Sequence, residues 1–201
     1  FIVFDDADLD SAANAQVAGI FAATGQSCVA GSRHLVQRSV KDAMLTRLKA
    51  MDKSLQTGQP VTADTLFGVA SHTKAFTAAA LAVLVQQGKL HWDDKVVQHL
   101  PEFRLSDEAI SQRITIRDLL SHRTGLGLGA GDLMIWPDTD KTPEQILAGL
   151  AQVPLAKDLR QGFAYNNLAF VAAGLLIERV SGMAYHQFVA QHFFQPLHMQ
   201  H

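Results

Sequence analysis

The spacing of apolar residues predicts helices through most of the chain. Apolar residues that recur every three to four positions indicate an amphipathic helix, whereas short apolar runs indicate strands. Strand-like runs occupy residues 2–4 and 34–37. The expected helices extend from the aspartates at 5–8 to about Thr24, over 41–54, 71–88 and 116–122, from Thr142 onward, and over 166–181 and 184–194. The pattern therefore predicts a mainly α (α+β) fold with few strands.

Capping residues and glycines mark where several of these helices begin and end. Thr115 followed three residues later by Asp118 forms a capping-box pattern, and Pro143 suits the first turn of a helix. Gly88 is expected to end the helix over 71–88. Residues 75–85 of that helix are apolar almost all round, which predicts a buried central helix. Residues 55–64 combine Gly, Pro and Thr and are the expected linker.

The composition argues against several classes of function. The formal net charge is −2 and no basic stripe is present, so we expect no nucleic-acid partner. The longest apolar run, 168–177, is too short to cross a bilayer, so we expect no membrane partner. Cys28 is the single cysteine, which rules out an internal disulfide. The chain begins at Phe1 without a secretory signal, which leaves its localisation open and cytoplasmic by default.

The sequence carries no motif for a metal or an organic cofactor. Its nine histidines, His198 and His201 among them, occur without an HExxH motif or a Cys/His pairing. The alternating glycines at 125–131 depart from G-x-G-x-x-G, because position 130 is Ala and no strand precedes them. There is no P-loop, and the lack of a G-x-S-x-G elbow argues against an α/β-hydrolase. We therefore expect no cofactor and no metal.

Ser71 and Lys74 form an S-x-x-K pattern at the start of the helix over 71–88. Residues three apart on a helix share a face, so the Lys74 ammonium can reach the Ser71 hydroxyl. A helix N-terminus adds partial positive charge where an oxyanion would develop. A serine becomes a good nucleophile only when a neighbour takes its proton, and an amine or a phenolate can do so. The pattern alone also fits a serine cap followed by a solvated lysine.

A series of ordered matches gives the S-x-x-K pattern its context. The matches are residues 64–78 around the serine, 88–94, 100–103, 116–126, 163–167 with a Y-x-N pattern, 180–183 and 196–199. On these motifs, residues 57–199 resemble the serine β-lactamase (class C), penicillin-binding protein and esterase family. The resemblance implies the helical part of that fold and acyl transfer on a β-lactam or a carboxylic ester.

The same resemblance implies roles for four residues. Ser71 would be the acylated nucleophile, and its backbone N–H would supply half of the oxyanion hole. Lys74 would take or hold the proton. Tyr165 would act as base toward Ser71 and as acid toward the leaving group, and Asn167 would orient the substrate carbonyl. Taken without its context, Tyr165 also fits a half-buried aromatic at a helix start.

The third motif of the family, K-T-G, K-S-G or H-x-G on a later strand, does not occur in the 201 residues. Arg123-Thr124-Gly125 belongs to a different signature. The opening strands of the family are also absent before Ser71. We therefore expect the helical part of the fold with most of its sheet missing. Losing one oxyanion donor costs about 10²–10³ in rate in a well-studied protease.

Residues 1–49 resemble a different family. Residues 2–10 and 19–33 are similar to the segment that bears the nucleophilic cysteine of aldehyde dehydrogenases, which places Cys28 in the thiolate position. The general-base glutamate and the dinucleotide-binding domain of that family are not in the chain. Cys28 also fits an ordinary small apolar residue or a free thiol, which we favour.

The sequence leaves three hypotheses for function. The chain divides into an aldehyde-dehydrogenase-like fragment, 1–50, and an incomplete β-lactamase/esterase-like helical region, 51–201. In the first hypothesis, Ser71 carries out acyl-enzyme hydrolysis of a small-molecule β-lactam or ester. In the second, the chain is a catalytically silent chimera of two enzyme fragments whose exposed apolar faces drive homo-oligomerisation. In the third, Cys28 retains aldehyde-dehydrogenase-related thiol chemistry.

Overall fold

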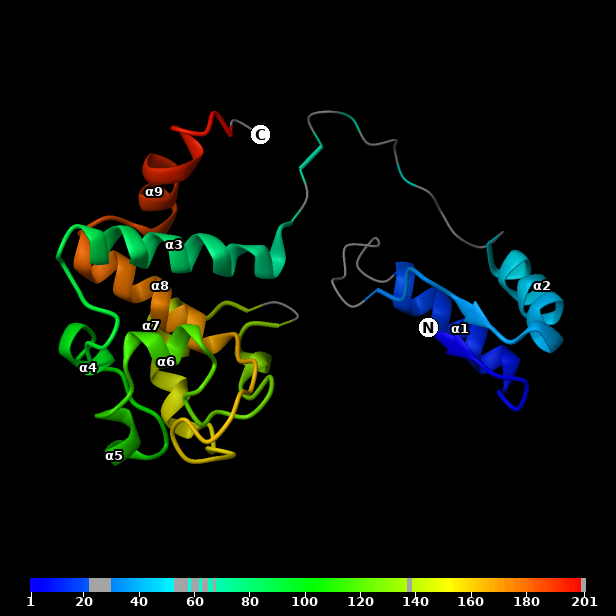
Figure 1. The fold of residues 1–201 in the computed structure, drawn as a ribbon, viewed down its shortest axis with the longest axis horizontal. Coiled ribbons are helices and arrows are strands. Elements are labelled where there is room, and N and C mark those ends of the chain that lie inside the picture. The colour runs from blue at the N-terminus through cyan, green and yellow to red at the C-terminus, as the bar shows by residue number, and fades with distance from the viewer. Residues whose placement is uncertain are drawn as a thin grey trace. The chain divides into compact units, whose positions relative to one another are not determined.

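The computed structural model describes residues 1–21, 30–52, 58, 62, 65–66, 68–136 and 139–199, which lie in two compact units. Unit 1 is Phe1–Gly68 and unit 2 is Val69–Gln200 (Figure 1). The predicted mainly α fold is confirmed, since the described residues are mostly helical and contain two short strands. Each unit is described by itself below.

The described part of unit 1 contains two short paired strands and two α-helices. Its elements are β1 (Ile2–Val3), α1 (Leu9–Phe21), β2 (Leu35–Val36), the 3₁₀ turn η2 (Arg38–Val40) and α2 (Lys41–Asp52). β1 and β2 run parallel, with Ile2 opposite Leu35. Asp8 begins α1 as predicted, because its Oδ1 accepts the N–H groups of Asp10 at 3.0 Å and Ser11 at 3.2 Å. The predicted ends of both helices, at 24 and 54, lie outside the described residues.

Unit 2 is built around α8. Its helices are α3 (Thr73–Gln86), α4 (Val96–His99), α5 (Glu108–Ser111), α6 (Ile116–Leu120), α7 (Pro143–Gly149), α8 (Leu168–Ser181) and α9 (Tyr185–Val189). Shorter turns are η3 (Ala70–His72), η4 (Asp132–Met134), η5 (Leu150–Gln152) and the π-helical η6 (Ala190–Phe194). α8 packs against α3, α4, α6, α7 and α9, and Ala172, Leu176 and Ile177 on it are fully buried. Burial of these apolar side chains is the main stabilising contribution to the unit.

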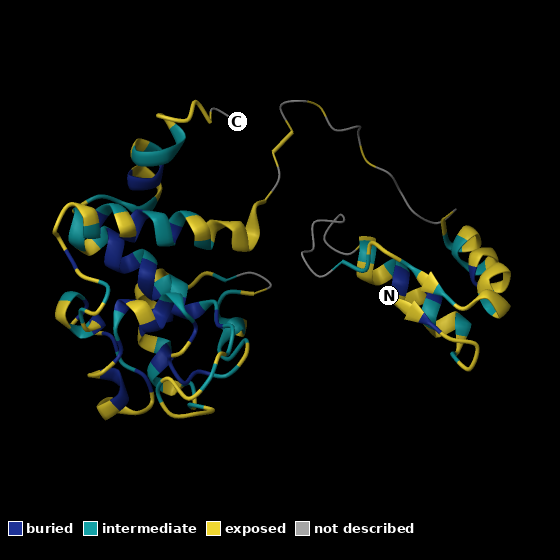
Figure 2. Cartoon of the chain, viewed as in Figure 1, coloured by how far each residue is buried: buried dark blue, intermediate teal, exposed yellow. Residues whose placement is uncertain are grey.

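The buried central helix is α8, and the prediction that residues 75–85 form it is wrong. Only one face of α3 is buried, through Thr77, Ala80, Leu81 and Leu84. Ala75 and Ala82 are exposed. The four buried residues recur at helical spacing on the face that packs against α8, and the buried colouring of Figure 2 is concentrated on α8. An apolar sequence all round a helix therefore did not mean burial all round.

Local start and stop signals are confirmed at several helices. Thr115 and Asp118 form a reciprocal capping box at α6, and Thr142 does the same with Gln145 at α7, where Pro143 is the first residue. Gly88 follows α3 at φ +69°, a backbone conformation that glycine adopts without steric cost. Among the described residues, no single helix is long and apolar enough to cross a membrane. α8 and the α9–η6 segment together have the length and apolar composition of a membrane span, but the chain bends by 76° between them.

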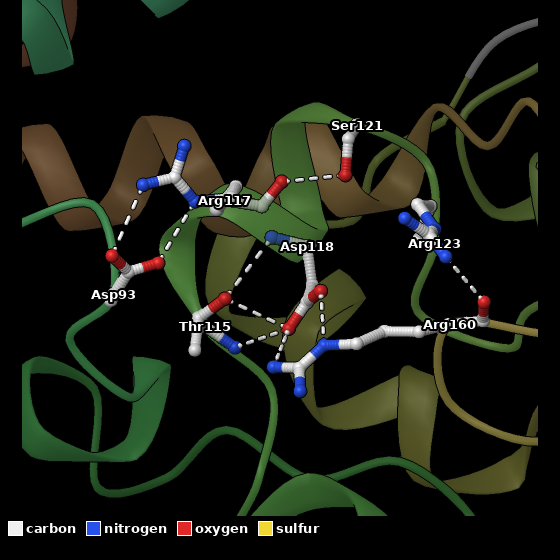
Figure 3. Close-up of polar contacts among 7 residues, drawn as sticks. All are labelled: Asp93, Thr115, Arg117, Asp118, Ser121, Arg123 and Arg160. Carbon is white, nitrogen blue, oxygen red and sulfur yellow. Dashed lines mark hydrogen bonds and ion pairs between the residues drawn. The ribbon is translucent and has the colours of Figure 1, made fainter.

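A polar network fastens α6 to the chain segment that leads to Tyr165 (Figure 3). Asp118 is 4% exposed and accepts two hydrogen bonds from Arg160, at 2.8 and 2.7 Å, besides those from Thr115. Burial acts to raise the pKa of the Asp118 carboxyl, but the hydrogen bonds from Arg160 and Thr115 outweigh it and hold the pKa below its ordinary value. The Arg123 side chain donates to the Arg160 carbonyl at 2.6 Å. Backbone hydrogen bonds from Ala156 to Gly125 and from Ala164 to His122 join the same two segments, so the segment before Tyr165 is held against residues 118–126.

Candidate active site

Ser71 lies in the 3₁₀ turn η3 and leads directly into α3. The predicted helix over 71–88 therefore begins as a 3₁₀ turn and becomes α-helical at Thr73. Ala70 beside it has φ +43°, in the left-handed region that residues with a Cβ seldom adopt. Such a conformation persists only where surrounding contacts impose it, and it occurs often next to functional groups. The Ser71 side chain is consequently presented on the surface of the unit.

The four residues proposed from the sequence lie in one hydrogen-bonded group. The Ser71 Oγ and the Tyr165 hydroxyl are 2.7 Å apart, and either can donate. Lys74 Nζ donates to Ser71 Oγ at 3.2 Å and to Asn167 Oδ1 at 2.7 Å. The Lys74 ammonium also lies 4.8 Å from the centre of the Tyr165 ring. Residues separated by more than 90 positions therefore meet at one hydroxyl.

The group places a phenol and an ammonium around one serine hydroxyl. Because Lys74 donates to Ser71 Oγ, the Ser71 hydrogen remains available for donation to the Tyr165 oxygen. A phenolate oxygen at Tyr165 could accept that hydrogen. The arrangement can therefore move a proton from Ser71 to Tyr165 as the serine oxygen attacks a carbonyl carbon.

Asn166 holds Tyr165 and Asn167 in place, a role that the sequence did not indicate. Asn166 is fully buried, and its Nδ2 donates to the carbonyls of Ala130 at 2.9 Å and Gly127 at 3.3 Å. Its Oδ1 accepts from the Ala169 N–H at 3.2 Å, at the start of α8. A buried amide with these partners ties the glycine-rich loop to α8. The middle residue of Y-x-N is thus the internal anchor, and its two neighbours face the site.

His122 is a second residue that sequence analysis missed. Its ring lies 4.6 Å from the Tyr165 ring, centre to centre, and its Nδ1 accepts the Asn166 N–H at 3.1 Å. The acceptor role of Nδ1 places the ring hydrogen on Nε2. Burial, followed by the charge of Lys74, lowers the pKa of His122 below its ordinary value. His122 therefore packs against Tyr165 as a neutral ring.

Asp132, at the start of η4, completes the group from the glycine-rich loop. Its Oδ2 accepts from Asn167 Nδ2 at 2.9 Å. In the sequence, Asp132 is marked only as a polar residue that follows a run of glycines, and His122 only as a histidine within the 116–126 match. Neither signal says which partner the side chain meets, because those contacts join distant segments.

The remaining candidates include residues that the structure does not describe. Cys28 lies outside the described residues, as does His201. Within the part of the chain that the structure describes, no three His, Cys, Asp or Glu side chains gather at a spacing that could hold a metal ion.

Comparison with known proteins assigns the family. Residues 40–201 match the family model described as Beta-lactamase, so the chain belongs to that family of β-lactamase-like hydrolases. It is 28% identical over 137 residues to Protein flp of Staphylococcus aureus, covering 68% of this chain and 28% of flp. The match spans 40–201 rather than beginning at 57, so the family likeness reaches into α2.

Solved structures support the same fold. The octameric penicillin-binding protein homologue of Pyrococcus abyssi is 32% identical with a TM-score of 0.58, over 70% of this chain and 33% of that one. The D-amino acid amidase of Ochrobactrum anthropi SV3 is 30% identical with a TM-score of 0.60, over 71% and 38%. The chain thus spans well under half the length of these relatives.

A relative of another kind matches a shorter stretch. A dehydrogenase of Acinetobacter baylyi, (Z)-2-((N-methylformamido)methylene)-5-hydroxybutyrolactone dehydrogenase, is 56% identical over 68 residues. Those residues are 34% of this chain and 14% of the dehydrogenase.

Proposed function

We propose that Ser71 is an acylable nucleophile and that the chain forms an acyl-enzyme with a β-lactam or a carboxylic ester. The contact that carries the proposal is the 2.7 Å approach of the Tyr165 hydroxyl to Ser71 Oγ, with Lys74 Nζ 3.2 Å from the same oxygen. A nucleophile and a base within hydrogen-bond reach, with a third group orienting them, are the geometric requirements for this chemistry.

The proposed reaction has two stages. Ser71 Oγ bonds to the substrate carbonyl carbon while its proton passes to the Tyr165 oxygen. The C–N bond of a lactam or the C–O bond of an ester then breaks, and the leaving nitrogen or oxygen takes the proton back from Tyr165. In the second stage, water gives a proton to Tyr165 and bonds to the acyl carbon, the bond from that carbon to Ser71 Oγ breaks, and Ser71 Oγ takes the proton from Tyr165. Asn167 would meet the substrate through the Nδ2 hydrogen that Asp132 does not use.

The Lys74 ammonium stabilises charge in this scheme. It is half-buried and lies 4.8 Å from the Tyr165 ring and 5.4 Å from the Phe170 ring. A cation held this close favours the phenolate that would receive the serine proton, and it favours it more in a partly dry site than in water. Lys74 would therefore act through charge and hydrogen bonding.

Acylation, rather than turnover, is the proper test of this proposal. The 201 residues contain no K-[ST]-G or H-x-G motif, so a second oxyanion donor of the family type is not among them. Since one such donor contributes about 10²–10³ in rate, we expect slow acylation and slower release. A covalent adduct accumulates under those conditions and can be counted.

The experiment is covalent labelling with located adducts. The protein is incubated with a fluorescent penicillin and separately with a fluorophosphonate, and the modified residue is identified by peptide mass spectrometry. We expect one adduct on Ser71 that is lost in Ser71→Ala and kept in Ser106→Ala, a control at another exposed serine. A folded protein that gains no adduct from either reagent refutes the proposal and favours a catalytically silent chimera.

We further propose that residues 1–50 derive from a dehydrogenase and residues 51–201 from the hydrolase family. The 56% identity with the Acinetobacter baylyi dehydrogenase over 68 residues supports a dehydrogenase origin for part of the chain, and the resemblance of 1–49 to aldehyde dehydrogenases favours its start. Retained thiol chemistry at Cys28 would give aldehyde-dependent reduction of NAD that disappears in Cys28→Ala. Equal NAD reduction in the two proteins, or none, would remove that alternative.

We also propose that the chain self-associates. Support comes from the exposed residues of α3 and from large exposed apolar side chains of unit 2, which include Leu133, Trp136 and Phe163. The Pyrococcus abyssi relative is described as octameric. Size-exclusion chromatography with light scattering should give a mass above 21.9 kDa. A sharp peak at the monomer mass across a range of concentrations would contradict this proposal.

A further inference from the structure

We propose that Asp132 is a positioning residue for the proposed reaction, which fixes the Asn167 amide in one orientation and thereby holds Lys74 against Ser71. The inference rests on the proposed function for its kinetic consequence, but its structural part can be tested without catalysis.

The contacts form a chain from a carboxylate to the nucleophile. Asn167 Nδ2 donates to Asp132 Oδ2 at 2.9 Å. On the opposite side of the same amide, Asn167 Oδ1 accepts from Lys74 Nζ at 2.7 Å, and Lys74 donates to Ser71 Oγ at 3.2 Å. The NH₂ end of the Asn167 amide therefore contacts an acceptor, the Asp132 carboxylate, and its oxygen contacts a donor, the Lys74 ammonium.

The character of Asp132 decides which way the amide faces. An ionised carboxylate only accepts hydrogen bonds, so it requires the NH₂ end of Asn167. The ammonium of Lys74 only donates, so it requires the oxygen end. A flipped amide would set oxygen against carboxylate and NH₂ against ammonium, losing two charge-assisted hydrogen bonds at once. Asp132 and Lys74 thus select the same orientation from opposite sides.

The backbone around Asp132 ties it to the same site. The Asp132 N–H donates to the Gly129 carbonyl at 3.0 Å, and the Gly129 N–H donates to the Tyr165 carbonyl at 3.0 Å. A Cβ on Gly129 would lie only 3.3 Å from Asp132 Oδ2, so a glycine leaves room for the carboxylate. The loop therefore fixes the position of Asp132 relative to both Tyr165 and Asn167.

The second oxygen of Asp132 makes no contact that competes with Asn167. Asp132 Oδ1 is buried and has no hydrogen-bond partner among the described residues. The structure gives Asp132 one hydrogen-bonded route to a cation, and it leads through Asn167 to Lys74.

The test compares Asp132→Asn with Asp158→Asn. Asp158 is a matched control because its Oδ2 also accepts from a side-chain amide, Gln161 Nε2 at 3.1 Å, on the exposed surface. Two quantities are measured in each protein: the ¹⁵N and ¹H shifts of the Asn167 NH₂ group, assigned with Asn167→Asp, and the second-order rate constant for fluorophosphonate labelling of Ser71. The urea midpoint by tryptophan fluorescence verifies that each variant is folded.

We expect Asp132→Asn to move the Asn167 NH₂ resonances and to slow labelling of Ser71 roughly 10- to 100-fold, because misplacing a catalytic group by about an ångström has that effect. Asp158→Asn should change neither quantity, and Asp132→Glu should recover part of the rate. Unchanged Asn167 resonances, or an unchanged labelling rate in Asp132→Asn, would overturn the inference. If wild type itself is not labelled, the proposed function fails, and the resonances alone decide whether Asp132 positions Asn167.

Discussion

The network around Asp118 gives the sharpest prediction for stability. In Asp118→Ala, α6 keeps the Thr115 cap but loses the reciprocal half of its capping box, the hydrogen bond from the Thr115 N–H to Asp118, worth about 1 kcal/mol. The bidentate pair with Arg160 is also lost; breaking a buried pair costs about 3–5 kcal/mol. The side chain of Arg160 is 47% exposed and regains water, so we discount that figure to about 2 kcal/mol. Together these losses lower the free energy of unfolding of unit 2 by about 3 kcal/mol.

Tryptophan fluorescence during urea unfolding measures this change in unit 2 alone, because Trp92 and Trp136 are the only tryptophans of the chain and both lie in that unit. The matched control is Asp93→Ala, since Asp93 makes a bidentate contact with Arg117 that is exposed on both sides (Figure 3). Its urea midpoint should stay close to wild type. Equal midpoints for the Asp118 and Asp93 variants would refute the reasoning.

Three further predictions use the same fluorescence assay or NMR. The pKa of Asp118 is lower in the folded state than in the unfolded chain, so ionised Asp118 stabilises the fold above the unfolded pKa of about 3.9. That contribution is lost as the pH falls through the folded-state pKa. Wild type should therefore lose more stability than Asp118→Ala on acidification below about pH 4. The folded-state pKa of His122 is also lowered, so the unfolded chain binds the proton first and stability declines as the pH falls below about 6.5; an NMR titration midpoint of its ring at or above about 6.5 would contradict this. Gly125→Ala should destabilise unit 2 by about 2 kcal/mol or more, because its φ is +91° and a Cβ would lie 2.6 Å from the Lys157 carbonyl oxygen. Gly88→Ala, at φ +69° with nothing near the Cβ, should cost less, and an equal loss would show that the contact with Lys157 is unimportant.

Local structure was predictable where the signal lies within a few residues. The capping boxes at Thr115 and Thr142 and the stop at Gly88 depend on neighbouring side chains and on glycine's freedom at positive φ, and the structure has all three. The ends of the helices were predicted less accurately. The helix expected over 166–181 begins at Leu168, and that over 184–194 divides into α9 and the π-helical η6.

Long-range packing was not predictable from apolar spacing. α3 and α8 both carry apolar stretches, yet only α8 is packed from several sides, because burial depends on which elements surround a helix. The candidate site shows the same limit. The S-x-x-K spacing singled out Ser71 and Lys74, and the family resemblance added Tyr165 and Asn167. Neither indicated His122 or Asp132, whose partners come from distant segments.

The central claim is that Tyr165 and Lys74 activate Ser71, and the rate of acylation tests it most directly. The second-order rate constant for the fluorophosphonate adduct on Ser71 is measured by intact-protein mass spectrometry in wild type, Tyr165→Phe and Tyr185→Phe. Tyr185 is the matched control, because its hydroxyl lies 2.8 Å from Thr77 Oγ1, in a different contact. The fluorophosphonate bonds through phosphorus to Ser71 Oγ and loses fluoride, which requires the same activation of Ser71 as acylation does. We expect Tyr165→Phe to slow this reaction about 10²-fold or more, as the loss of a general base does, and Tyr185→Phe to react like wild type. Equal rate constants for wild type and Tyr165→Phe would contradict the claim.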